Sequence, residues 1–351
     1  MNRIMICPLL AFLHRVLGLE IQFMYTARIA HLAFNTCAYY VNQLDPDHHL
    51  NDRFVFVFGA DPCNKQLFRM WKRHVRFIES RFVLFWFNAD LDYLLTKKFI
   101  GYLPFVHTEF KVIDQAPALM FTDEEEAKGR ALLDHMGIGA DDWFMCFQSR
   151  DSAYQRQIRG LDENRSSVHS KIDAYMDAAQ LISSMGGFAI RVGWGFAEKI
   201  DTHGDPHIID YARDYRTDFG DIYLSGKSRF VISTTGLFAV PPLFKVPVVF
   251  ANSMPPRIWP IGRHSLMVPK LFKDKRTGAI VPFSVLNEYG ALSYARPEIV
   301  RWRHPNTLVE YGLEVVDNQP DEIKGAALDM INHTEGREPS REALEVQEFY
   351  K

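Results

Sequence analysis

Residues 143–148 read WFMCFQ, a run of mostly apolar side chains that predicts a buried β-strand. The run ends in Ser149, Arg150 and Asp151, so polar and charged residues follow the strand at its carboxyl end. In open α/β sheets, ligands bind at the carboxyl ends of the strands. This stretch therefore marks the edge of a sheet at which a ligand site is expected.

Helical patterns and further apolar runs alternate around this strand. Upstream, Thr122 and Glu125 have the spacing of a capping box, which predicts a helix from there to about residue 136. Downstream, we expect in order a helix at 172–185, strands at 188–192 and 208–211, a helix at 218–225, a strand at 230–233, a helical run after Gly236 and a strand at 246–250. This alternation is typical of βαβ units around a parallel sheet.

The first part of the chain shows the same alternation, with strands expected at 19–25, 54–59 and 82–87 and helices at 31–44 and 64–74. The length of 351 residues exceeds what one hydrophobic core usually fills. We therefore expect an α/β protein of two Rossmann-like domains facing a cleft. The expected parts are an N-terminal domain at 1–115, a C-terminal domain at 116–325 and a helical tail at 326–351, which is a candidate for packing back on the first domain.

The composition excludes several classes of protein. A net charge of -3 gives no electrostatic reason to expect nucleic acid as the main partner, and a hydrophobic share of 47% argues against disorder. The four cysteines form no Cys-x-x-Cys pair, which argues against a zinc site and favours a cytoplasmic protein. No stretch of about 20 apolar residues predicts a transmembrane helix. For residues 5–17, a buried or amphipathic helix and a membrane-surface contact both stay open.

The strand expected at 230–233 leads into Ser233, Thr234, Thr235 and Gly236, and then into a helical run. A helix start offers free N–H groups and the positive end of the helix dipole, and glycine lets the backbone approach an anion closely. The pattern is therefore typical of a phosphate site. The alternative is a simple helix cap, because serine and threonine are also preferred cap residues.

Two arginines are expected at the same edge of the sheet. Arg150 and Arg191 each stand at the carboxyl end of a predicted strand, and the planar guanidinium group suits bidentate contact with phosphate. Together with the Ser-Thr-Thr-Gly segment they would suit a diphosphate. In the alternative, each arginine pairs with a neighbouring carboxylate such as Asp151 or Asp210.

Asp218 and Asp221 begin the next predicted helix and either bind part of the ligand or only cap and charge that helix. Asp90 and Asp92 have an Asp-x-Asp spacing, but such triplets are common and no metal is expected there. The basic stretch at 270–276 is interpreted as a solvated loop.

Several longer segments are similar to those of a known family. They are RIAHLAFN (28–35), CNKQLFRMWKRH (63–74), FQSRDSAY (147–154), IDAYMDAAQLISSMGGFAIRVG (172–193), IIDYA (208–212), TDFGDIYLSGKSRFVISTTGL (217–237) and DNQPDEI (317–323). Through them the chain resembles, from about residue 26 to 325, a family of bacterial glycosyltransferases from surface-polysaccharide gene clusters. The resemblance implies a GT-B architecture, in which the C-terminal domain holds a nucleotide-diphosphate sugar and the N-terminal domain binds a glycan or lipid-linked acceptor.

The segment at Arg150, Asp151 and Tyr154 also resembles the Arg-Asp-x-x-Tyr motif of fucosyltransferases, in which the arginine stabilises the leaving diphosphate. The resemblance assigns this role to Arg150. No metal and no cofactor are expected, since the arginines and the helix dipole can stabilise the leaving group. The complete set of expected donor-binding residues is Arg150, Tyr154, Arg191, Gly193, Asp218, Asp221, Ser233, Thr234, Thr235 and Gly236.

An enzyme that inverts the anomeric centre needs a base near the acceptor hydroxyl. His31, at the first expected strand-to-helix turn, is one candidate and Asp151 is the other, whereas a retaining enzyme needs none. The chain departs from the family pattern in two places. Ala30 stands where the family has glycine, and residues 168–171 stand where the family has an Arg-Asn-x-Asp stretch.

The sequence thus predicts a glycosyltransferase that transfers a sugar from a nucleotide-diphosphate sugar to a glycan or lipid-linked acceptor in surface-polysaccharide synthesis. It is expected in the cytoplasm, with a peripheral contact to the inner face of the membrane as an option, and no oligomeric state is predicted. Two alternatives stay open: a sugar-nucleotide epimerase on the same scaffold, and a catalytically inactive relative that acts as a scaffold subunit.

Overall fold

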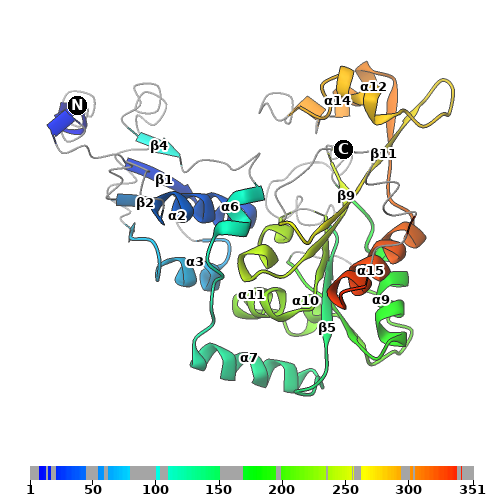
Figure 1. Ribbon diagram of the computed structural model, residues 1–351, viewed down its shortest axis with the longest axis horizontal. Helices are drawn as coiled ribbons and strands as arrows, with labels where there is room; N and C mark the ends of the chain where they lie inside the picture. The colour runs from blue at the N-terminus through cyan, green and yellow to red at the C-terminus, as the bar shows by residue number, and fades with distance from the viewer. Residues whose placement is uncertain are drawn as a thin grey trace. The chain divides into compact units, whose positions relative to one another are not determined.

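The computed structural model describes residues 8–12, 15–16, 21–44, 54–58, 62–79, 100–102, 110–150, 169–194, 199–234, 236–254, 256, 262–293, 301–302, 305–337 and 341. The chain divides into two compact units, Met1–Leu119 and Met120–Lys351 (Figure 1). The division expected from the sequence lies a few residues earlier, at 115/116.

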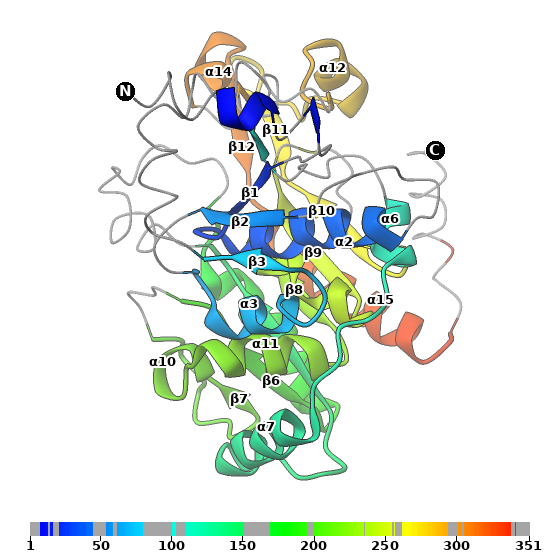
Figure 2. The same ribbon diagram turned by 90° about the vertical axis from the view of Figure 1, so that its left-hand side faces the viewer.

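The first unit contains, in its described residues, a four-stranded parallel sheet with the order β3-β2-β1-β4. Figure 2 shows β1, β2 and β3 side by side. Asn64 caps the helix α3 by accepting a hydrogen bond from the Leu67 amide at 2.9 Å. The elements are β1 (Ile21–Tyr25), the π-helix η1 (His31–Asn35), α2 (Thr36–Leu44), β2 (Phe54–Phe58), α3 (Lys65–Trp71), β3 (Phe77–Ile78), β4 (Ile100–Tyr102) and α6 (Phe110–Gln115).

The second unit is built on a six-stranded parallel sheet with the order β10-β9-β8-β5-β6-β7. The chain starts in the middle with β5 (Phe144–Gln148), adds β6 (Phe188–Arg191) and β7 (Ile208–Ile209) on one side, and then returns. It adds β8 (Val231–Ser233), β9 (Val248–Ser253) and β10 (Leu266–Pro269) on the other side. This reversal places the topological switch point of a doubly wound sheet between β5 and β8.

Helices cover this sheet, and its central strand is fully buried. All five residues of β5 are buried, as their apolar run predicted. Helices α9 and α15 pack against each other on one face of the sheet, with α10 and α11 on the opposite side in Figure 1. Besides this sheet, the main part of the second unit contains the helices α7 (Asp123–His135), η3 (Ile172–Tyr175), α9 (Met176–Ser184), α10 (Tyr211–Asp214), α11 (Asp218–Lys227), η4 (Leu237–Ala239), η5 (Pro241–Phe244) and α15 (Pro320–Thr334).

A smaller layer follows β10 in the chain. It pairs β11 (Leu271–Asp274) with β12 (Leu313–Val316) in antiparallel fashion and includes the helices α12 (Phe283–Glu288) and α14 (Pro305–Glu310). Its own apolar core includes Trp302, which is fully buried and stacks on Tyr311 with 5.3 Å between ring centroids. Trp302 therefore has a packing role in this layer.

The predicted fold class, α/β with parallel sheets of Rossmann-like strand order, is confirmed. The capping box is confirmed as well, because Thr122 accepts from the Glu125 amide and Glu125 accepts from the Thr122 amide. The start of the tail at residue 326 falls inside α15, whose residues Ala327 and Met330 belong to the core of the second unit. That part of the predicted tail is therefore part of the second unit. The strand predicted at 82–87 and the triplet at 90–92 lie outside the described residues.

Candidate functional site at the switch point of the second sheet

The two strands that flank the switch point are tied together where they end. Gln148 of β5 lies opposite Ser233 of β8, and the Ser233 hydroxyl donates to Gln148 Oε1 at 2.9 Å. One step further, the Arg150 amide donates to Thr234 Oγ1 at 2.9 Å. The sequence predicts that Arg150 and Thr234 lie at one edge of a sheet, and in the structure the two residues are in direct contact.

Small hydroxyl side chains lie where β5 and β8 end. Ser149, Ser233 and Thr234 are fully buried. The Ser149 hydroxyl has no hydrogen-bond partner among the residues that the structure describes. A buried polar group without a partner costs free energy, so polar atoms of this kind are common where a ligand completes the hydrogen bonds.

The segment after β8 differs from the expected helix start. Gly236 has φ 82° and ψ -83°, a left-handed backbone that favours glycine. It is followed by two short 3₁₀ helices, η4 and η5, instead of an α-helix. The predicted helix dipole is therefore absent from this segment, since a single 3₁₀ turn aligns few peptide dipoles. What the segment offers is hydroxyl groups, a tight glycine turn and the nearby Arg150. Thr235 lies outside the described residues.

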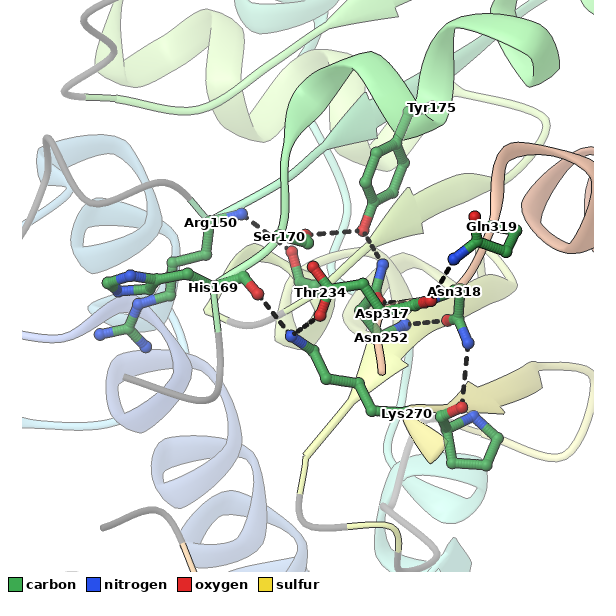
Figure 3. A network of polar contacts seen from close by, with 11 residues as sticks. Arg150, His169, Ser170, Tyr175, Thr234, Asn252, Lys270, Asp317, Asn318 and Gln319 are labelled. Carbon is green, nitrogen blue, oxygen red and sulfur yellow. Dashed lines mark hydrogen bonds and ion pairs between the residues drawn. The ribbon is translucent and has the colours of Figure 1, made fainter. Parts of the chain in front are cut away.

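A buried polar network continues from Arg150 into the sheet (Figure 3). The Ser170 amide donates to the Arg150 carbonyl at 3.1 Å, and the hydroxyls of Ser170 and Tyr175 share a hydrogen bond of 3.2 Å. Asn252 Nδ2 donates to Tyr175 Oη at 3.2 Å. Tyr175 is fully buried, and burial raises the pKa of its hydroxyl, so the group stays neutral. This network fixes the main chain around Arg150.

Three residues near Arg150 were missed by the sequence analysis. His169 lies beside Arg150 in Figure 3, and burial together with the arginine charge lowers the pKa of its imidazole to about 4. Lys270 is 1% exposed and contacts Asp317 at 2.6 Å. The interpretation of residues 270–276 as a solvated loop is therefore wrong at Lys270, and it is also wrong for residues 271–274, which form β11 with Phe272 fully buried. No local pattern marks a lysine that the fold will cover, although Asp317 belongs to the segment DNQPDEI that carries the family resemblance.

Arg191 takes the alternative role that the sequence left open. It ends β6, but its side chain is 1% exposed and its Nη1 lies 3.2 Å from Asp210 Oδ2. Asp210 also accepts from the Ile200 amide at 3.3 Å. The guanidinium group is thus held in a buried ion pair inside the unit. Gly193, two residues further on, has φ 116°, which favours glycine at this turn.

The two aspartates at the start of α11 are paired with Arg216. Its Nη2 lies 3.3 Å from Asp218 Oδ1 and 2.9 Å from Asp221 Oδ2. Asp221 is buried, and burial raises the pKa of its carboxyl group to about 7, against the opposing effect of the arginine. The guanidinium also lies over the Trp194 ring, 5.9 Å from its centroid. These contacts organise the start of α11.

The remaining candidates are divided between the first unit and the residues that are not described. Asp151 and Tyr154 lie outside the described residues, and so does Val168, the first residue of the departure from the family pattern at 168–171. His31 is the first residue of the π-helix η1, and its Nδ1 lies 3.4 Å from Asn35 Nδ2. Its ring meets Tyr25 edge-on at 5.3 Å. π-Helical turns are rare overall, and those that occur often lie at functional sites. His31 therefore stays a candidate base.

Comparison with known proteins gives similarities of fold only. No known family model matches the sequence, and no curated protein matches it. The chain is similar to the Escherichia coli ADP-heptose lipopolysaccharide heptosyltransferase II, with 12% identity, 72% of this chain and 90% of that chain covered, and a TM-score of 0.45. It is similar to a family 9 glycosyl transferase from Veillonella parvula, with 8% identity, coverage of 90% and 97%, and a TM-score of 0.48. For the Escherichia coli heptosyltransferase WaaC with ADP, identity is 9%, coverage 77% and 96%, and the TM-score 0.37.

At such identities, function has to be argued from the residues of the site. Within the described residues, no helix has both the length and the apolar character needed to cross a membrane.

Proposed function

We propose that the protein is a glycosyltransferase that binds a nucleotide-diphosphate sugar at the switch point between β5 and β8. The observation that carries the proposal is the contact between the Arg150 amide and the Thr234 hydroxyl. It places an arginine and a group of buried hydroxyls at the one edge of a doubly wound sheet where ligands bind. The resemblance of the surrounding segments to polysaccharide glycosyltransferases supports the same conclusion.

The chemistry of sugar transfer fits these residues. As the bond between the sugar and the diphosphate breaks, negative charge grows on the phosphate oxygens. A guanidinium group that donates two parallel hydrogen bonds stabilises this charge more in the transition state than in the ground state. We assign this role to Arg150, in a mechanism that needs no metal ion. The imidazole of His169, which lies beside Arg150, carries no charge at neutral pH, because its pKa is lowered to about 4.

Other predicted donor residues receive a supporting role in this proposal. Arg191 is engaged with Asp210, and both Asp218 and Asp221 are engaged with Arg216. A ligand would have to break these ion pairs to use them. We therefore assign these three residues to the support of the sheet edge. We leave the direct phosphate contacts to Arg150 and to the Ser149 hydroxyl, which has no hydrogen-bond partner among the described residues.

The first unit is assigned the binding of the acceptor in this proposal. We propose that it binds a glycan or lipid-linked acceptor, and that His31 or Asp151 takes the proton of the attacking hydroxyl if the enzyme inverts. We further propose a cytoplasmic location with a peripheral membrane contact. Leu9, Phe12 and Val16 support this contact, because they follow helical spacing and are 55%, 58% and 60% exposed.

The test is a screen of purified protein against GDP, UDP, ADP, CDP and TDP by thermal shift and calorimetry. One nucleotide is expected to raise the melting temperature with saturation, since a ligand that binds only the folded state stabilises it. Arg150→Ala is expected to weaken binding about 10- to 100-fold, the effect of losing a hydrogen bond to a charged group. The matched control Arg276→Ala removes an exposed arginine from the turn after β11 and is expected to bind like the wild type.

Two outcomes would redirect the proposal. Binding by none of the five nucleotides would overturn the donor site and favour the inactive scaffold. Conversion of a nucleotide sugar to an isomer or to free sugar without any acceptor would favour the epimerase.

A further inference from the structure

Lys270 stands at an uncommon place for a lysine. It lies between β10 and β11, and its side chain is 1% exposed. Burial lowers the pKa of its ammonium group, while the negative charge of Asp317 acts in the opposite direction. A buried charge costs free energy unless it is paired and hydrogen-bonded. The partners of this ammonium group therefore explain why the fold accepts it.

The ammonium group joins two segments that are far apart in the sequence. Lys270 Nζ lies 2.6 Å from Asp317 Oδ1, just after β12, and it also donates to the His169 carbonyl, just before η3. The Asp317 side chain is 45% exposed, so water solvates the part of the carboxylate that the lysine does not reach. The pair thus reaches from the surface of the unit to its polar interior.

The segment that Lys270 holds is the one that holds Arg150. The Ser170 amide donates to the Arg150 carbonyl at 3.1 Å, while the Arg150 amide donates to Thr234 at 2.9 Å. Both peptide groups of the arginine are thereby anchored, one to the end of β8 and one to Ser170. The hydrogen bond from the Ser170 amide holds the Arg150 carbonyl only if the His169–Ser170 segment itself stays in place. Figure 3 shows Lys270 contacting that segment from below.

A contribution to the stability of the fold does not by itself explain why a lysine is buried at this position. Replacing a buried ion pair by apolar residues of similar volume is often neutral or stabilising. An apolar side chain at position 270 would fill the space, but it could not donate to the His169 carbonyl. The property that needs the ammonium group is therefore the position of this carbonyl and of the chain attached to it.

We propose that Lys270, together with Asp317, is a positioning residue that holds the His169–Ser170 segment and, through it, the main chain of Arg150. The proposal rests on the proposed function where it concerns the donor diphosphate. The mechanical link between Lys270 and Arg150 belongs to the protein without any ligand, and it is tested in that state.

The test compares Lys270→Met with Lys275→Met in the full chain. Both changes replace a lysine by an uncharged side chain of similar length, but Lys275 is exposed. The readout is residue-resolved amide hydrogen exchange without ligand. In Lys270→Met, the Ser170 amide and the Arg150 amide are expected to exchange about tenfold faster, the fold-change that corresponds to one lost hydrogen bond of a charged group. The amides of β6 are expected to keep their rates, as all rates are in Lys275→Met.

Unchanged exchange at both amides in folded Lys270→Met would overturn the proposal, and so would an equal rise over the whole unit, which indicates a purely structural role. If Lys270→Met does not fold, Asp317→Asn gives the same readout, because its side chain is half exposed. A nucleotide titration then separates the two proposals. If the Lys270 variant exchanges faster and the protein binds no nucleotide, the positioning role stands and the donor site is overturned. If the variant exchanges like the wild type and the protein binds a nucleotide, the donor site stands and the positioning role is overturned.

Discussion

Arg191→Met tests the division of roles between the two arginines of the sheet edge. Arg191 and Asp210 are 1% and 2% exposed in their side chains, so removal of the arginine leaves a carboxylate buried without its counter-charge. Breaking a buried pair in this way costs about 3–5 kcal/mol. For a unit of this size, the loss corresponds to a fall in melting temperature of about 6–20 °C.

The double variant Arg191→Met, Asp210→Asn provides the matched control. It removes both charges, and the asparagine oxygen can still accept the hydrogen bond that Asp210 receives from the Ile200 amide. We expect it to recover most of the lost stability, since uncharged replacements of buried pairs are often neutral. Urea unfolding of the three proteins, followed by circular dichroism, measures the free energies. A fully stable Arg191→Met that no longer binds nucleoside diphosphate would refute the assignment and return Arg191 to the donor site.

Three further changes have expected outcomes. Gly129→Ala should destabilise the protein by about 1–3 kcal/mol instead of strengthening α7, because its Cβ would lie 2.0 Å from the Tyr223 ring; a gain in urea resistance would contradict this. Thr234→Val should cost about 1–3 kcal/mol and weaken nucleotide binding, because the partly buried Arg150 amide loses its acceptor; unchanged unfolding and affinity would contradict this. Asp221 has a folded pKa of about 7, above its ordinary value, so the folded state keeps a proton that the unfolded chain loses. Stability should therefore fall as pH rises from about 4 to 7, and Asp221→Asn should flatten that slope in unfolding curves at a series of pH values.

The strands β5 to β9 of the second sheet follow from simple apolar runs in the sequence, whereas β10, β11 and β12 were not predicted. The buried run at 143–148 gave β5, and the capping spacing of Thr122 and Glu125 gave the start of α7. These predictions succeeded because apolar periodicity and helix caps act over a few neighbouring residues. The sharing of one edge by Arg150 and Thr234 followed from the parallel sheet, in which all strands end at the same edge.

The partners of charged residues were harder to predict. Arg191 could be placed at the end of a strand, but its choice between a ligand and Asp210 depends on how the chain returns from β7. The burial of Lys270 depends on Asp317, which is far away in the sequence and becomes a neighbour only when β11 pairs with β12. The α-helix expected after Gly236 is absent for a local reason, since Pro241 and Pro242 lie five and six residues further on and lack the N–H groups that an α-helix needs there.

A nucleoside diphosphate is expected to bind at the carboxyl ends of β5 and β8. The decisive measurement is a crystal structure of the protein with the nucleoside diphosphate that binds in solution. We expect phosphate oxygens within hydrogen-bond distance of the Arg150 guanidinium group and of the Ser149 hydroxyl. A nucleotide bound at the first unit, or at the second unit away from Arg150, would contradict it.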